Sequence, residues 1–232
     1  MQLAGSSSWR ISEDRWPESF DWALWFRAAE RIDVESEGVV PGAVDIEPLP
    51  DPSTDPSEAA ELAAGWLAWW RSLIDLPPVP PPSDRAHPPA ALAFSPPDFP
   101  GLASWPGLQR VVTRRWRQAH DWHTARMKAG LEAGVHGDAR TGQVVAGLER
   151  ELGREARPFS LDFVLLPVRD EQVRPIGPDR YLVPERVYDG PRWPGLLRGL
   201  LIPRAWNLAG HATGSRSQIC SISGTNRGES PC

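Results

Sequence analysis

Three histidines and an aspartate that lie close together in the chain have the residue types and the spacing of metal ligands. His120 and His123 are three positions apart, and His136 and Asp138 follow a short way downstream. Side chains three positions apart lie on the same side of a helix, and imidazole and carboxylate groups are common zinc ligands. These four residues form a candidate divalent-metal site, which supports the hypothesis of a metal-dependent enzyme. The alternative is that His120 and His123, at the edge and near the centre of an apolar helix face, make ordinary hydrogen bonds and that no cofactor is bound.

Two arginines project into the middle of the same apolar helix face. At 100° per residue, Arg115 and Arg126 fall among the apolar side chains of the helix expected over residues 104–134. A buried guanidinium group is costly unless a carboxylate meets it. We expect a structural ion pair with Asp162, which stands alone on an otherwise apolar strand face, and an acidic residue from the strongly acidic segment 1–61 as the next choice. The alternative is that the arginine stems pack while their head groups reach water.

Tryptophans and prolines offer a candidate protein-interaction surface. Trp66, Trp69 and Trp70 lie on one face of a helix expected over residues 55–75, and the proline-rich segment that follows contains Pro77, Pro80 and Pro81 in the spacing of a minimal PxxP ligand. An aromatic helix face of this kind is usually core, and it becomes an exposed patch only where a partner covers it. Our leading hypothesis from the sequence is a non-catalytic interaction or adaptor protein whose partner is another protein.

A row of arginines gives a third hypothesis, nucleic-acid binding. Arg110, Arg114 and Arg117 follow one another at helical spacing, and Trp116 and Trp122 lie nearby as aromatic groups on which bases could stack. The tryptophans and the arginine row project to different sides of the helix, which is typical of a solvated face. Nucleic acid is therefore not the expected partner.

Several classes of protein lack support from any motif. The chain has no glycine-rich phosphate-binding motif of the GKS, GKT or GxGxxG type and no GxSxG nucleophile motif. Its two cysteines, Cys220 and Cys232, lie close to the end. No apolar run approaches the roughly 20 residues that a membrane helix needs, and the first residues lack the pattern of a signal peptide. We expect no membrane partner and a location in the bacterial cytoplasm.

The expected architecture is α+β. The sequence predicts a single domain over residues 1–204, in which one helical layer packs on a small antiparallel sheet, a three-stranded meander. The segment 77–101, with many prolines, is predicted to be a linker or surface wrap, and residues 205–232 a disordered tail. The predicted helices cover residues 12–32, 55–75, 104–134 and 141–152, the strands lie within 159–188, and a last short apolar helix or strand covers 195–202.

Overall fold

The computed structural model describes residues 2–5, 9–44, 46, 48, 50–76, 92–134 and 139–206. The strands are β1 (Gln2–Gly5), β2 (Trp9–Asp14), β3 (Phe159–Leu166), β4 (Arg174–Pro175) and β5 (Arg180–Pro184). The helices are α1 (Glu18–Ala29), η1 (Pro56–Glu58), α2 (Ala59–Asp75), η2 (Pro100–Leu102), α4 (Pro106–Glu132), α5 (Ala139–Leu152), α6 (Glu185–Tyr188) and α7 (Trp193–Ala205). No helix within these residues is long and apolar enough to cross a membrane. The α+β class predicted from the sequence is confirmed.

The sheet is mixed, which corrects the predicted antiparallel meander. Its five strands lie in the order β1-β2-β3-β5-β4, and the central strands β2, β3 and β5 run parallel. Only the edge strands β1 and β4 are antiparallel to their neighbours. The physical reason lies in β3, where Leu161, Phe163 and Leu165 face one core while Val164 and Leu166 face another. A strand buried on both faces is typical of a parallel sheet covered on both sides.

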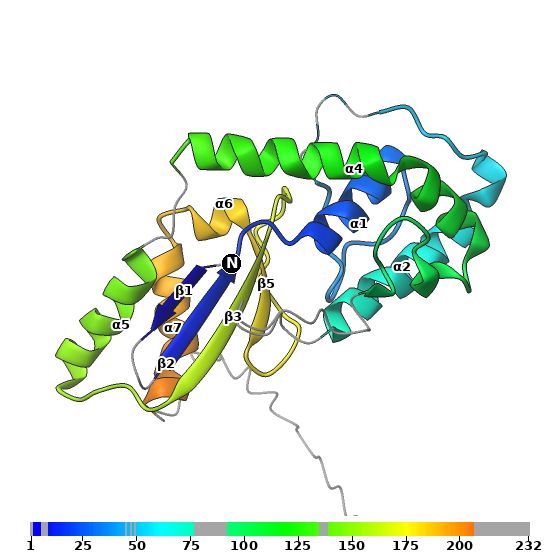
Figure 1. The fold of residues 1–232 in the computed structure, drawn as a ribbon. Coiled ribbons are helices and arrows are strands. Elements are labelled where there is room, and N and C mark those ends of the chain that lie inside the picture. Colours follow the sequence, from blue (N-terminus) through cyan, green and yellow to red (C-terminus); the bar gives the residue numbers. More distant parts are fainter. Residues whose placement is uncertain are drawn as a thin grey trace, which may run out of the picture.

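Two hydrophobic cores cover the two faces of this sheet. The first joins β3 and β5 to α1, α2 and α4, and the second joins the opposite face to α5 and α7. Figure 1 shows α5 on one side of the strands, α1 and α2 on the other, and α4 running above the strand ends. The predicted single helical layer is therefore wrong, because the helix predicted over residues 141–152 lies on the opposite face from the other three.

The helix predicted over residues 12–32 divides into a strand and a shorter helix. Pro17 lies at the N-cap of α1 in an extended conformation, with φ −75° and ψ 92°. Proline is tolerated at a helix start but breaks a helix interior, so the preceding residues stay extended. They form β2, whose Ile11 is fully buried against β3. α1 is buried on almost every side within the first core, where it contacts α2 and α4, and its sequence is accordingly largely apolar.

The predicted linker and tail both have packed ends. Of the proline-rich segment 77–101, residues 77–91 lie outside the described residues, but Phe94 and Phe99 are buried in the first core. Of the predicted tail, residues 207–232 lie outside the described residues. Ala205 ends α7 and Trp206 is buried in the second core, so the tail cannot begin at residue 205. The start of the tail was placed too early because single apolar residues among small ones show no periodicity.

Candidate functional site at the carboxyl ends of the parallel strands

The carboxyl ends of β2, β3 and β5 lie at one edge of the sheet, and charged residues follow each of them. Arg15 comes after β2, Arg169 follows β3, and Glu185 and Arg186 follow β5. α4 crosses above this edge in Figure 1 and adds side chains from a distant part of the sequence. In open α/β sheets, ligands bind at the carboxyl ends of parallel strands. This edge is therefore the candidate functional site.

A fully buried carboxylate, Asp21 of α1, lies at the centre of the charged group. Its Oδ2 lies 2.6 Å from Nδ1 of His123 and accepts a hydrogen bond of 2.6 Å from Nη2 of Arg126. The Asp21 side chain has no exposed surface, and that of His123 is 8% exposed. Aspartate beside arginine and histidine gives charge-assisted hydrogen bonds, about twice as strong as neutral ones. The contact joins α1 to α4 through polar groups inside an apolar core.

Arg126 connects the buried carboxylate to the strand ends. Its Nη1 donates to Oε1 of Glu185 at 2.7 Å, and its Nη2 donates to the backbone carbonyl of Arg15 at 3.2 Å. Burial raises the pKa of Glu185, and the nearby Arg126 lowers it by less. Burial also raises the pKa of Asp14, the last residue of β2. The carboxylates here are desolvated, and Arg126 is held between two of them.

An open hollow of about 670 Å³ lies in front of this network. We call it the arginine hollow, and its lining residues are Arg126, Pro167, Val168, Arg169, Glu185 and Arg186. Three guanidinium groups and one carboxylate line it, so positive charge predominates. Nη1 of Arg186 donates to the backbone carbonyl of Arg169 at 2.6 Å, which links the loop after β3 to α6. Guanidinium groups match carboxylate and phosphate oxygens in geometry and charge, so the hollow is suited to an anion.

Comparison of the chain with protein-family models, with curated proteins and with solved structures finds no match.

The two predicted metal ligands that the structure describes, His120 and His123, do not converge. His120 and His123 each approach a different carboxylate, since Nδ1 of His120 lies 3.1 Å from Oε1 of Glu18 while His123 contacts Asp21. His120 and Glu18 are both about half exposed. His136 and Asp138 lie outside the described residues, and within the described ones no three histidine, cysteine or acidic side chains could hold a metal ion together. The metal-dependent enzyme stays an untested hypothesis.

Arg115 and Arg126 both meet carboxylates from the acidic segment 1–61, and Asp162 is the partner of neither. Arg115 forms a buried ion pair with Glu30, and Arg126 forms one with Asp21. Asp162 accepts a hydrogen bond from Ser12, its direct neighbour on β2. The physical reason is position: Asp162 lies in the middle of β3, whereas α4 crosses beyond the carboxyl ends of the strands.

The tryptophans predicted as an interaction surface lie in the first core. Trp66, Trp69 and Trp70 are at most 1% exposed. Nε1 of Trp66 donates to the carbonyl of Ala23 at 2.6 Å, and the Trp66 and Trp70 rings stack at 5.2 Å. Pro77, Pro80 and Pro81 lie outside the described residues. A protein-interaction function therefore stays a prediction, with the segment 77–91 as its remaining basis.

The arginine row on α4 is engaged within the chain. Arg110 pairs with Glu58 at 2.5 Å, and Nη2 of Arg114 donates to Oγ of Ser53 at 2.7 Å. The Arg117 guanidinium lies 5.4 Å from the centre of the Trp116 ring. These contacts attach α4 to the segment before α2, so the row supports a structural role better than a nucleic-acid interface.

Sequence reasoning missed Asp21, Arg169 and Arg186 as members of one site. A signal for Asp21 was present, because a lone carboxylate inside the apolar run Phe20–Phe26 marks a buried charge that needs a partner. No comparable signal marked the two arginines. They lie together because β3 and β5 pair directly and run parallel, whereas the predicted meander separated these two strands by a third one.

Proposed function

We propose that this protein binds a small anionic ligand, through a phosphate or carboxylate group, in the arginine hollow. The observation that carries the proposal is that Arg126, Arg169 and Arg186 line one open hollow that contains a single carboxylate, Glu185. The hollow also lies at the carboxyl ends of β3 and β5, where parallel sheets bind ligands.

Hydrogen bonds to Asp21 and Glu185 restrict the conformation of the Arg126 side chain before a ligand binds. Asp21 and Glu185 hold its two terminal nitrogens, so little side-chain freedom remains to be lost when a ligand binds. Its Nε is buried and has no hydrogen-bond partner in the part of the chain that the structure describes. An unsatisfied buried donor costs about 1–3 kcal/mol, and a ligand oxygen that reached it would recover part of this cost.

Binding is better supported than acid–base catalysis. Asp21 and His123 form a pair of the kind that orients a catalytic histidine, but His123 is buried and is not among the residues that line the hollow. A general base has to reach the proton that it removes. The pair therefore supports a role in holding Arg126 and α4 in place.

The test is calorimetric titration with inorganic phosphate at constant ionic strength. We expect saturable binding by the wild type and a loss of at least about tenfold in affinity for Arg186→Gln and for Arg169→Gln, since each change removes one charge-assisted contact. Both side chains are exposed, so neither change should unfold the protein. The matched control is Arg198→Gln, which removes an exposed arginine of α7 that pairs with Glu151. Equal affinity for all four proteins, or no saturable binding by the wild type, would refute the proposal.

A further inference from the structure

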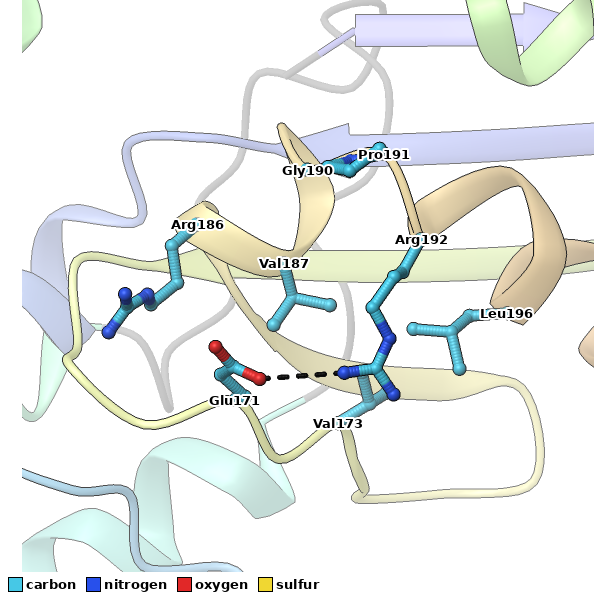
Figure 2. Close-up of a pocket in the computed structure, with 8 residues that line it drawn as sticks. All are labelled: Glu171, Val173, Arg186, Val187, Gly190, Pro191, Arg192 and Leu196. Atoms are coloured by element: carbon cyan, nitrogen blue, oxygen red, sulfur yellow. Dashed lines mark ion pairs between the residues drawn. The ribbon is translucent and has the colours of Figure 1, made fainter.

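A second hollow adjoins the first, and it has the opposite character. It has a volume of about 360 Å³ and lies between the connection from β3 to β4 and the start of α7. We call it the apolar hollow, and its lining residues are Glu171, Val173, Arg186, Val187, Gly190, Pro191, Arg192 and Leu196. Figure 2 shows Val173, Val187 and Leu196 gathered around one space.

An exposed ion pair lies in the lining of the apolar hollow. Oε2 of Glu171 lies 3.6 Å from Nη1 of Arg192, and the two side chains are 62% and 79% exposed. Exposed pairs of this kind contribute little to stability, so they separate at small cost. Leu196, behind the pair, is 39% exposed, which is unusual for a large apolar residue in the described part of this chain. The hollow therefore holds apolar surface that a ligand could cover.

Arg186 belongs to the lining of both hollows. Figure 2 shows its guanidinium group directed away from Val187 and Leu196. The backbone of Arg186 and the neighbouring Val187 thus lie between a region of positive charge and a region of apolar side chains. A single ligand that contacts Arg186 with an anionic group has apolar surface next to it.

The size of the apolar hollow limits the apolar part of such a ligand. A cavity of about 150 Å³ accommodates one benzene ring. The volume of about 360 Å³ is more than twice as large, enough for a fused two-ring group or a branched aliphatic group of similar size.

We infer that the ligand is an amphipathic organic anion. Its carboxylate or phosphate group lies in the arginine hollow, and its apolar body, of about two rings, lies against Val173, Val187 and Leu196. The inference rests on the proposed anion-binding function and specifies the class of anion. It accounts for the exposed Leu196, which the anion-binding function alone leaves without a role.

The experiment compares 1-naphthyl phosphate with inorganic phosphate as probes, by calorimetric titration of the full chain. We expect the naphthyl ester to bind at least about tenfold more tightly than phosphate, because its rings cover apolar surface in addition to the same anionic contact. Leu196→Gln should remove most of this advantage while leaving the affinity for inorganic phosphate unchanged. The matched control is Leu92→Gln, since Leu92 is also an exposed leucine, at 53%, and lines neither hollow. Val173→Thr, which keeps the side-chain shape and adds a hydroxyl, serves as a second variant if Leu196→Gln is unstable.

The outcomes separate this inference from the proposed function. If phosphate binds and the naphthyl ester binds no more tightly, the apolar hollow has no role and only the inference fails. If Leu196→Gln and Leu92→Gln reduce the affinity for the ester equally, the inference also fails. If neither probe binds, the anion site itself is refuted. If the ester binds and Arg186→Gln leaves its affinity unchanged, the anionic group does not lie in the arginine hollow, and both are overturned.

Discussion

Asp21→Asn removes the charge from the most deeply buried carboxylate of the candidate site. The side chain keeps its shape, so the change in stability reports the loss of charge and of hydrogen bonding. Asp21 has no exposed side-chain surface, and its partners Arg126 and His123 are 15% and 8% exposed. The variant therefore leaves a buried guanidinium group with Glu185 as its remaining carboxylate partner.

The magnitude follows from these contacts. Hydrogen bonds to charged groups contribute about 1.5–3 kcal/mol each, and breaking a buried ion pair costs about 3–5 kcal/mol. Glu185 still pairs with Arg126 in the variant, so the expected loss of stability lies at the lower end of this range, about 3 kcal/mol. With a urea m-value of about 2–3 kcal/mol per molar, the unfolding midpoint should fall by about 1 M.

The assay is urea unfolding at neutral pH, followed by tryptophan fluorescence. A double-mutant cycle of Asp21→Asn with Arg126→Met should give a coupling energy of about 2 kcal/mol, because the two side chains share one contact. The control is Glu151→Gln, which removes an exposed partner of Arg198 and should leave the midpoint unchanged within error. A loss below about 1 kcal/mol for Asp21→Asn, or a coupling near zero, would show that the network does not hold α1 and α4 together.

Three further predictions concern other parts of the chain. A chain that ends at Trp206 should have the same melting temperature as the full chain. A chain that ends at Pro203 should lose about 3–5 kcal/mol of stability, because Ala205 and Trp206 are 0% and 2% exposed. Equal melting temperatures for the two truncated chains would contradict this prediction. Trp66→Ala should cost about 3–5 kcal/mol in denaturant melts, since the ring is fully buried and its Nε1 binds the carbonyl of Ala23, and a wild-type melt would instead favour an exposed docking helix. Burial raises the pKa of Glu185, so folding favours the protonated form of this side chain. The stability that results is complete below the pKa of Glu185 in the unfolded chain and is lost as the pH rises through its pKa in the folded protein. Glu185→Gln should therefore gain stability relative to wild type as pH rises from about 4 to about 7 in urea melts, and a difference that falls with pH would refute the assignment.

The elements that depend on local signals were predictable. The helix predicted over residues 55–75 begins with such signals, because Asp55 accepts a hydrogen bond from the backbone of Ser57 and Pro56 lies in the first turn of η1. The apolar spacing of the sequence also places α4 and β3 close to their observed bounds. Caps, helical periodicity and alternation act over a few residues, so a single sequence contains them.

Strand pairing was not predictable in the same way. The alternating pattern of a strand does not identify its neighbour, and the turns between β3, β4 and β5 favoured consecutive pairing. The missed signal was the nearly continuous apolar sequence at the end of β3, which indicates burial on both faces.

The candidate site was predictable only in part. That Arg126 needs a carboxylate follows from its place on an apolar helix face. Which carboxylates it meets does not, because Asp21 and Glu185 are 105 and 59 residues away in the chain. Contacts between residues so far apart in the sequence depend on the packing of several elements at once, and a local sequence pattern cannot predict them.

The parallel pairing of β2 with β3 has a consequence for how the chain is made. Ser12 and Asp162 lie opposite each other in the sheet although 150 residues separate them in sequence. During synthesis, β2 has only β1 as a neighbour in the sheet until β3, residues 159–166, has been made. Contacts of this range form slowly, because a long loop must close first. The edge that carries the arginine hollow also requires β5 and α6, so the proposed ligand site is complete only after residues 180–188 have been made. Until β3 is made, β2 has one unpaired edge, and unpaired strand edges are prone to aggregation.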